Sequence, residues 1–282
     1  MTDTTTANQV ETQPGNTPEA EIQAGNEGKK EEGNFFVFLL KLVLVVVIFR
    51  SFIFSPFNIP SESMMPGLVN GDQLLAAKWP YGYSKNSFPL LPGRIFASAP
   101  ERGDVVIFKH PIDGTDYIKR AIGLPGDTVE MRDGQIILNG EAVPQVRIAD
   151  FIIPQSANTL CHAFSETTTL SDGTPACRYQ QYRETLPGGV SYNVLDFGAF
   201  PKDNFGPVVV PEGKFFAMGD NRDNSQDSRF PAEPGGGVGI VPEENLVARA
   251  SVMMWSTDGS AEWLLPWTWF TAARGERIGN SL

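Results

Sequence analysis

The stretch "DTVEMRDGQIILNGEAV", Asp127 to Val143, carries the clearest secondary-structure signal in this chain. Its short alternating and apolar runs are separated by the pairs Asp133-Gly134 and Asn139-Gly140. Such pairs supply the positive φ values that tight hairpin turns require. The stretch therefore predicts short antiparallel strands joined by two-residue turns.

Similar runs recur along the chain from Gly71 onward, and no long amphipathic helix or fixed repeat interrupts them. The 28 Gly and 22 Pro among 282 residues also indicate many turns. We therefore expect a mainly β protein with an antiparallel β-rich core formed by residues 58–141 and 208–282. Residues 142–207 are polar and without clear periodicity, which predicts an inserted second lobe. The supporting runs are "QLLAAKW", "GDVVIFKH", "DYIKRAIG", "GPVVVPEGKFFAMGD" and "NLVARASVMMW".

The N-terminal part of the chain has a different composition. Residues 1–34 are polar with no apolar period, which predicts a disordered acidic tail. Residues 35–57 are apolar apart from a few polar positions, and a stretch of about 20 such residues spans a bilayer as a helix. A signal peptide would begin with a basic region and end in a small-residue cleavage site, and a buried core helix would show a polar face. One transmembrane helix over 35–57 is therefore the favoured interpretation.

The flanking charges give a weak prediction of orientation. Lys29 and Lys30 precede the apolar segment, and the positive-inside rule places such residues in the cytoplasm. Arg50, close to the other end, blurs this signal. The large domain is then expected outside the cytoplasm.

Charge and the rarer residues narrow the possible functions. A formal net charge of −11 argues against a nucleic-acid partner, because binding to phosphates needs a basic surface. Cys161, Cys177, His110 and His162 have no metal-ligand spacing, so neither a metal site nor a cofactor is expected. The two cysteines form one disulfide in an oxidising compartment or remain two separate thiols, and the sequence leaves both readings open.

The stretch "NIPSESMMPGL", Asn58 to Leu68, raises the question of a nucleophilic serine. A serine nucleophile needs a base, but neither histidine lies in a triad context and the G-x-S-x-G motif is absent. A buried lysine is the other possible base, because desolvation lowers its pKa. Lys119 lies in a largely apolar predicted strand, with Tyr117 and Ala121 on the same face. On this evidence alone, a solvated lysine on a half-exposed strand is the commoner outcome.

Four stretches resemble the conserved blocks of bacterial type I signal peptidases, also called leader peptidases. They occur in the family's order after a membrane span, and they cover most of residues 35–255 except the middle lobe. They are "PSESMMPGL", "GDQLLAAKWPYG", "RGDVVIFKHP" with "DYIKRAIGLPGD", and "GDNRDNSQDSR" with "GIVPEENLVARA".

The resemblance implies a membrane-bound serine endopeptidase with a Ser/Lys dyad. It would remove signal peptides from exported preproteins after small residues, at Ala-x-Ala sites, through an acyl-enzyme. By position, Ser63 matches the nucleophile and Lys119 the general base. Ser61 matches the serine that forms the oxyanion hole with the Ser63 backbone N–H, and Ser225 the serine that orients the lysine amine. The remaining implied residues are an ion pair beside the site, Asp227 and Arg229, and the substrate-binding positions Phe57, Ile59, Tyr117 and Ile118.

The family also implies a cellular setting. Together with the one predicted span, it implies a single-pass protein of the bacterial inner membrane whose catalytic domain faces the periplasm. The implied partners are exported preproteins, the lipid bilayer and the secretion translocon, with no nucleic acid and no cofactor.

Three positions depart from the family pattern. Gly67 stands where a threonine is usual, and Glu62 where glycine is frequent. A carboxylate near the lysine would raise its pKa and oppose the base function, so we expect Glu62 to point to solvent. The segment "PAEPGGGVG", Pro231 to Gly239, resembles an insertion, for which a flexible surface loop is the simplest expectation.

Two other classes of function remain open. A membrane-anchored β-domain without enzymatic activity would not need Ser61, Ser63, Lys119 and Ser225 together. A soluble self-cleaving regulator with the same dyad would carry a DNA-binding module, which the acidic charge and the membrane span disfavour. The tryptophan-rich C-terminal segment, residues 262–282, is compatible with either a membrane surface or core packing.

Overall fold

The computed structural model describes residues 2, 34–87, 91, 93–161, 165–262 and 264–282. The predicted disordered tail, residues 1–34, lies almost entirely outside these residues, as does His162. The chain divides into two compact units, Met1–Ile48 and Phe49–Leu282. The second unit holds every strand described below.

One apolar helix, Asn34–Ile53, has 20 residues and a mean hydropathy of 2.6, so it is long and apolar enough to cross a bilayer. Its last turn is the π-helix η1 (Phe49–Ile53). The helix ends four residues before the predicted boundary, because Phe54 to Phe57 lie in strand β1 (Phe54–Asn58). Pro56 explains the difference, since proline has no N–H to donate and pushes the preceding Ser55 out of helical conformation.

The hairpin prediction for residues 127–143 is confirmed. Strands β7 (Thr128–Arg132), β8 (Gln135–Leu138) and β9 (Glu141–Ala142) pair antiparallel in sequence. Asp133 and Gly134 have φ values of 47° and 81°, and Asn139 and Gly140 have 54° and 84°. Both turns therefore use two successive left-handed residues, as type I′ hairpin turns do.

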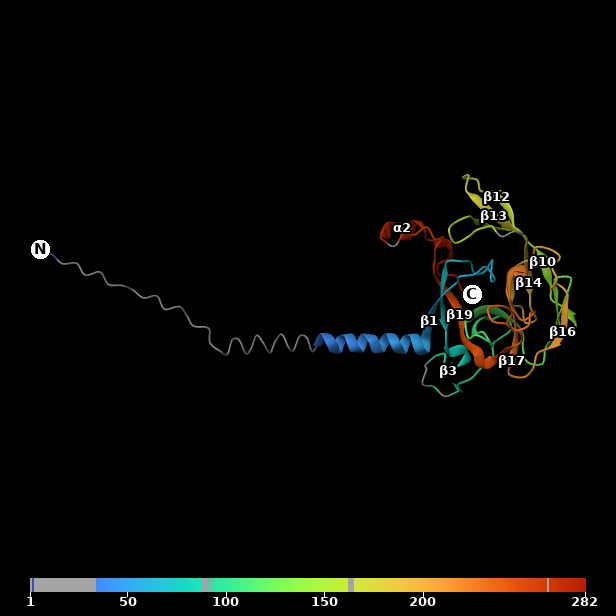
Figure 1. The fold of residues 1–282 in the computed structure, drawn as a ribbon, viewed down its shortest axis with the longest axis horizontal. Helices are drawn as coiled ribbons and strands as arrows, with labels where there is room; N and C mark the ends of the chain where they lie inside the picture. The colour runs from blue at the N-terminus through green and yellow to red at the C-terminus, as the bar shows by residue number, and fades with distance from the viewer. Residues whose placement is uncertain (1, 3–33, 88–90, 92, 162–164, 263) are drawn as a thin grey trace. The chain divides into compact units, whose positions relative to one another are not determined.

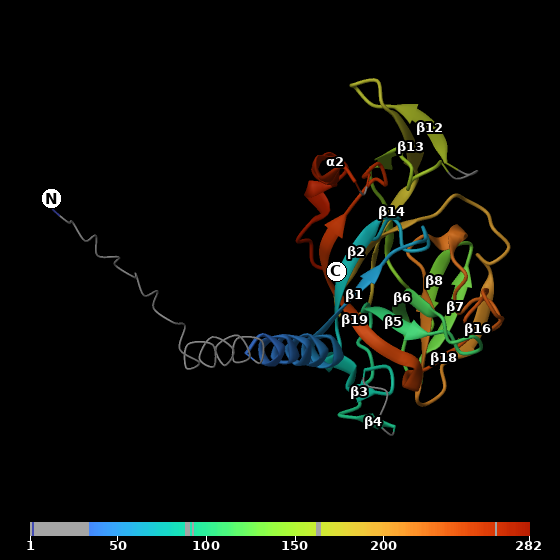
Figure 2. The same cartoon turned by 60° about the vertical axis from the view of Figure 1, so that its left-hand side comes forward.

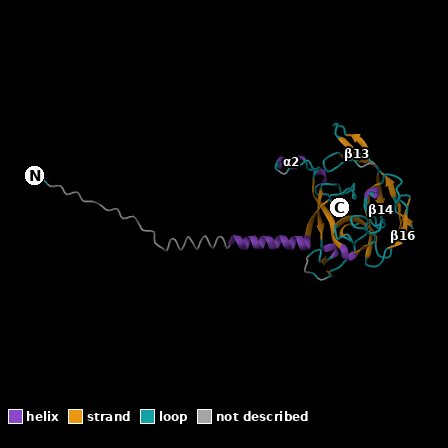
Figure 3. Ribbon diagram, viewed as in Figure 1, coloured by secondary structure: helices purple, strands orange, loops and turns teal. Residues whose placement is uncertain are grey.

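A seven-stranded antiparallel sheet forms the centre of the second unit (Figures 1 and 2). Each of the other predicted runs contributes at least one strand, so the mainly β antiparallel fold is confirmed; Figure 3 shows how strands dominate this unit. In sheet order, the strands are β1, β2 (Asp72–Ala77), β19 (Leu246–Ser256), β5 (Val105–Lys109), β6 (Asp116–Gly123), β17 (Lys214–Met218) and β18 (Val241–Pro242).

Part of strand β6, next to the candidate site described below, has no strand partner on one edge in the described chain. Strand β1 is the terminal strand of the sheet order and pairs only with β2 among the described strands. Strand β6 pairs with β5 along Asp116 to Arg120, but with β17 only from Arg120 to Gly123. The half of β6 from Asp116 to Lys119 therefore has one edge without a strand partner in the described chain.

The predicted lobe, residues 142–207, forms two small sheets and contributes to a third. Their strands are β10 (Gln145–Arg147), β14 (Gln181–Thr185) and β15 (Ser191–Leu195); β11 (Phe151–Pro154), β13 (Pro175–Tyr179) and β12 (Glu166–Thr169); and β16 (Phe205–Val209), which pairs with β7. The hairpin β12–β13 projects at one end of the unit in both views (Figures 1 and 2).

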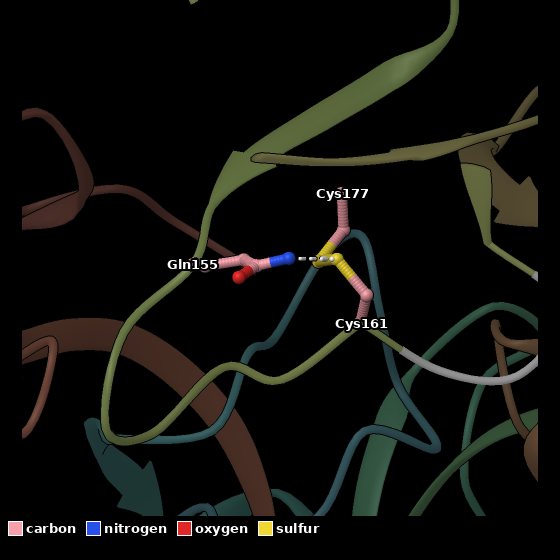
Figure 4. Close-up of a disulfide and its surroundings, with 3 residues drawn as sticks. All are labelled: Gln155, Cys161 and Cys177. Carbon is pink, nitrogen blue, oxygen red and sulfur yellow. Dashed lines mark hydrogen bonds between the residues drawn. A yellow bond between two sulfur atoms is a disulfide. The ribbon is translucent and has the colours of Figure 1, made fainter. Parts of the chain in front are cut away.

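The lobe shares its core with the rest of the unit. One buried cluster joins Val194 and Tyr192 of β15 to Ile122 of β6 and Met131 of β7. The described chain also contains a disulfide between Cys161 and Cys177, with Gln155 Nε2 donating a hydrogen bond to Cys161 Sγ (Figure 4). Of the two alternatives that the sequence left open, the two cysteines therefore form the disulfide.

The described tryptophans of the C-terminal segment are not packed into the core, although Ala272 of the same segment is buried. Trp267 and Trp269 of helix α2 (Pro266–Thr271) are 64% and 43% exposed, while Trp263 lies outside the described residues. After α2 the chain runs back along β19, where Met253 N–H donates to Asn280 O and Gly279 N–H donates to Met253 O. The remaining short elements are β3 (Tyr83–Ser84), β4 (Arg94–Ile95), η2 (Trp79–Tyr81), η3 (Arg222–Asn224), η4 (Glu243–Asn245) and η5 (Gly275–Arg277).

Candidate active site

The turn that carries Ser63 is anchored by apolar residues on two sides. Met64 and Leu68 enter the core cluster beneath β2, β5 and β19. Met65 and Val69 enter a second cluster, which is built from the lobe residues Ile153, Cys177, Tyr179 and Leu195. Because the turn is held by both clusters, Ser63 occupies a fixed position although it belongs to no strand or helix.

The C-terminal segment also holds this turn. Arg277 Nη2 donates to Gly67 O at 2.8 Å and to Asp72 Oδ2 at 2.7 Å, and Asp72 Oδ2 accepts the Val69 N–H at 2.8 Å. Neither Arg277 nor Asp72 was singled out from the sequence, because they lie 205 positions apart and outside the serine-bearing stretch.

Gly67 has room for a side chain. A Cβ at Gly67 would lie 3.5 Å from Met64 O and 3.6 Å from Asp220 Oδ2, which is ordinary contact distance. Glycine is therefore not demanded by crowding here, and the Gly67 carbonyl, rather than a side chain, makes the contact to Arg277. A threonine at this position would place its hydroxyl close to the Asp220 carboxylate.

Lys119 lies buried on β6 and points at the serine. Its Nζ is 2.7 Å from Ser63 Oγ and 3.0 Å from Ile118 O, and the residue is 4% exposed. Burial lowers the pKa of Lys119 to about 8, although the charges of Asp227 and Asp220 act in the opposite direction. The buried alternative to a solvated lysine is thus the one observed, and near neutral pH a useful fraction of the amine is neutral.

Two further serines lie at the site. Ser61 Oγ is 3.4 Å from Ser63 Oγ. Ser225 Oγ is buried without a hydrogen-bond partner in the described part of the chain, and it makes no hydrogen bond to Lys119 there. Ser225 approaches Gly219 so closely that a Cβ at Gly219 would lie 2.2 Å from Ser225 Oγ and 2.5 Å from Ser63 O. The absence of a side chain at Gly219 lets the two serine-bearing segments meet.

The predicted ion pair beside the site is present. Arg229 Nη2 is 2.9 Å from Asp227 Oδ2, and both side chains are buried. Asp227 Oδ2 also accepts the Gly219 N–H at 3.1 Å. The pair therefore fixes the segment between Gly219 and Arg229, which includes Ser225.

A cleft of about 360 Å³ opens beside the dyad, and all four predicted substrate-binding residues line it. One wall is the end of β1 and the turn after it, and the other is the open edge of β6 from Asp116 to Lys119. The lining includes Phe57, Ile59, Ser61, Ser63, Tyr117, Ile118, Lys119 and, from the glycine-rich insertion, Gly235.

Two expectations about the departures from the family pattern need correction. Glu62 is half-buried rather than directed only to solvent, and its Oε2 accepts a hydrogen bond from Asn224 Nδ2 at 3.3 Å. The segment from Pro231 to Gly239 is not a free surface loop, because Gly237 and Val238 are buried and Val238 N–H donates to Asp227 O.

Comparison with known proteins agrees with the geometry. Residues 33–255 match the family model "Signal peptidase, peptidase S26". A signal peptidase I of Rickettsia massiliae is 35% identical over 246 residues, which cover 82% of each chain, and one of Rickettsia akari is 36% identical over 230 residues, 77% of each chain. A solved signal peptidase I structure from Enterococcus faecalis aligns over 55% of this chain and 98% of that one at 23% identity, with a TM-score of 0.29, too low to support a structural argument. The chain belongs to the signal peptidase family, peptidase S26, and is a serine endopeptidase.

Proposed function

We propose that this protein removes N-terminal signal peptides from exported preproteins after small residues, at Ala-x-Ala sites, by a Ser63/Lys119 dyad. The observation that carries the proposal is the 2.7 Å contact between Lys119 Nζ and Ser63 Oγ, made by a lysine whose burial favours the neutral amine. A neutral amine at this distance can accept the hydroxyl proton, which a charged ammonium cannot do.

The proposed reaction proceeds through two similar steps. Ser63 Oγ attacks the scissile carbonyl carbon while its proton passes to Lys119 Nζ. The Ser63 N–H and the Ser61 hydroxyl donate to the developing oxyanion, an interaction of a kind that contributes about 3 to 4 kcal/mol in other serine peptidases. Protonated Lys119 then gives its proton to the leaving amine, which leaves an acyl-enzyme on Ser63. In the second step Lys119 takes a proton from the water that attacks the ester, and it gives that proton to Ser63 Oγ as the signal peptide leaves.

The shape of the cleft supports an extended substrate. The open edge of β6 offers backbone groups to a peptide strand laid beside Asp116 to Lys119, a common mode of peptide recognition. Phe57, Ile59 and Ile118 give the cleft an apolar lining next to the dyad. A shallow apolar lining of this kind suits small side chains at the first and third residues before the cleaved bond. For Ser225 we propose, on the family motif alone, the role of orienting the Lys119 amine, since its buried hydroxyl makes no hydrogen bond to Lys119 in the described part of the chain.

The proposed location is the inner membrane, with the unit Phe49–Leu282 on the periplasmic side. The apolar helix Asn34–Ile53 supports a membrane anchor, and the disulfide between Cys161 and Cys177 suits an oxidising compartment such as the periplasm. Exported preproteins are the substrates, and the lipid bilayer and the secretion translocon are the proposed neighbours.

The test is cleavage of a preprotein with an Ala-x-Ala site by the full chain purified in detergent. Ser63→Ala and Lys119→Ala are each expected to abolish cleavage, because one removes the nucleophile and the other the base. Ser251→Ala is a control at a serine outside the cleft lining and is expected to cleave at the wild-type rate. Full activity in either dyad variant would refute the assignment, and an inactive wild type would favour a binding protein without enzymatic activity.

A further inference from the structure

The glycine-rich insertion, Pro231 to Gly239, is folded as a compact hairpin, here called the glycine loop. Glu233 N–H donates to Gly237 O, and Gly236 N–H donates to Glu233 O, which closes the tip. At its base, Gly239 N–H donates to Phe230 O at 3.0 Å. The loop therefore has a defined conformation of its own.

Three side chains of the β5–β6 hairpin hold the glycine loop in place. Asp113 Oδ2 accepts the Gly235 N–H at 2.8 Å, and Tyr117 Oη donates to Gly236 O at 3.2 Å. Buried His110 lies with Nε2 3.0 Å from Gly237 O. Since His110 Nδ1 accepts the Ile112 N–H at 3.2 Å, Nε2 carries the proton and donates to the Gly237 carbonyl. Three consecutive glycines are thus each fixed to the strand pair that forms one wall of the cleft.

The glycine loop reaches the cleft itself, because Gly235 lines it together with Asp116 and Tyr117. These residues lie at the end of the open β6 edge that is far from Ser63. From Lys119 to Asp116 the strand advances about 10 Å, or three residues of an extended peptide. Ile118, on the way, belongs to the pockets assigned to the residues just before the cleaved bond. A peptide laid along β6 therefore meets the loop upstream of its third residue before that bond.

We propose that the glycine loop is the upstream wall of the substrate cleft and contacts preprotein residues that precede the third residue before the cleaved bond. The inference rests on the proposed function and adds a specificity element to it. Because Gly235 and Gly236 present no side chain, the loop allows close backbone approach of the substrate. It should strengthen binding of longer substrates without selecting particular side chains, and so act on KM rather than on kcat.

Asp113 gives a clean way to release the loop, because it touches Gly235 but does not line the cleft. Its own turn, Asp113-Gly114-Thr115, has a twin in Asp172-Gly173-Thr174. In both turns the aspartate Oδ1 accepts the threonine N–H at 2.9 Å, but Asp172 lies in the turn before β13 rather than beside the glycine loop. Asp172→Ala is therefore a matched control for Asp113→Ala.

The experiment compares two peptides cleaved by the full chain in detergent. The short peptide begins three residues before an Ala-x-Ala cleavage point, and the long one extends four residues further upstream. The wild type is expected to prefer the long peptide in kcat/KM. Asp113→Ala should lower the long-to-short ratio roughly fivefold to tenfold, through KM of the long peptide, which is within the range that one ordinary hydrogen bond contributes. Asp172→Ala should keep the wild-type ratio.

A second variant adds bulk at the loop itself. Gly235 has a φ of 67°, and a Cβ there meets nothing within 4 Å, so Gly235→Asn can keep the left-handed conformation. It should also lower the long-to-short ratio. An unchanged ratio in both Asp113→Ala and Gly235→Asn would overturn the inference while leaving the proposed function intact. A wild type that cleaves neither peptide would overturn the proposed function and the inference with it.

Discussion

Two buried cations in this protein have opposite surroundings. Lys119 is 4% exposed, and its amine contacts a serine hydroxyl and a backbone carbonyl. Arg222 is 2% exposed, and its guanidinium forms two hydrogen bonds with the carboxylate of Glu184, one of them at 2.6 Å. Tyr192 Oη donates to the same carboxylate at 2.8 Å.

Burial has different results at the two positions. At Lys119 burial lowers the pKa to about 8, because the nearby charges of Asp227 and Asp220 raise it by less than burial lowers it. Burial alone would also lower the pKa of Arg222, but Glu184, Tyr192 and Asp220 together raise it. Lys119, a buried cation without an ion-pair partner in the described chain, is suited to proton transfer. Arg222, which is paired, instead links Glu184 of the lobe to the segment that carries Ser225.

The largest effect is expected from Lys119→Arg, which places a permanently charged group at the unpaired position. A guanidinium has a pKa above about 12 and cannot accept the Ser63 proton. We expect kcat to fall by roughly a thousandfold or more, within the range that general-base catalysis contributes. Single-turnover cleavage of a preprotein by the full chain measures this, and cleavage at near wild-type rate would contradict the role of Lys119.

Glu184→Gln breaks the paired position and should act mainly on stability. It leaves the Arg222 charge buried without its partner, a change that costs about 3 to 5 kcal/mol in other buried pairs. The thermal unfolding midpoint of the full chain in detergent should fall markedly. Glu130→Gln, which removes the partner of the exposed Arg132, is the matched control and should stay close to wild type. Equal midpoints for the two variants would show that depth of burial does not distinguish these pairs.

Gly219→Ala tests a residue that contacts the Arg222 side chain and lies against the segments that carry Ser63 and Ser225. Gly219 O accepts a hydrogen bond from Arg222 Nε at 3.2 Å, and a Cβ here would collide with Ser225 Oγ and Ser63 O. Because a displacement of about 1 Å at a catalytic group costs roughly a hundredfold, kcat should fall by about that factor. KM should change little, since the cleft lining does not include Gly219. A kcat equal to that of the wild type would mean that the segments carrying Ser63 and Ser225 can accommodate the added methyl group without a functional displacement.

The smallest effect is expected in the pH profile. In the proposed mechanism the neutral amine is the working form, so kcat/KM should be low under acidic conditions and rise as pH increases through the Lys119 pKa, about 8. Asp227 raises that pKa, so Asp227→Asn, which also leaves buried Arg229 without its partner and lowers stability, should move the rising limb of the folded enzyme to lower pH. Residual activity measured across pH values checks the direction. A limb that moves to higher pH would contradict this electrostatic account.

The strands and turns were predictable because their signals are local. The pairs Asp133-Gly134 and Asn139-Gly140 located both hairpin turns, and the run "DYIKRAIG" coincides with β6. The end of the apolar helix was predicted four residues too late, since hydropathy continues through Phe57 while Pro56 stops the helix. The pairing of Cys161 with Cys177 was left open, because sixteen residues of sequence separation do not determine a distance in space.

The candidate site was predictable only in part. Family motifs brought Ser61, Ser63, Lys119 and Ser225 into consideration, but the sequence favoured a solvated Lys119 until the motifs were considered. No sequence signal that we recognised indicated three features of the site. They are the hydrogen bond from Arg277 to Gly67 O, the hydrogen bond from Asn224 to Glu62 and the place of Gly235 in the cleft lining. These contacts join residues that are far apart in the chain.

The reactive pair, Ser63 and Lys119, was proposed from family motifs, whereas residue order alone predicted an apolar helix long enough to cross a membrane and the succession of short strands. These depend on hydropathy, turn chemistry and residue type, which act over a few neighbouring positions. Folding in three dimensions set the burial of Lys119, its 2.7 Å approach to Ser63 and the place of Gly235 in the cleft lining. The physical reason is that desolvation, and with it the pKa of a lysine, depends on which distant segments pack around the side chain.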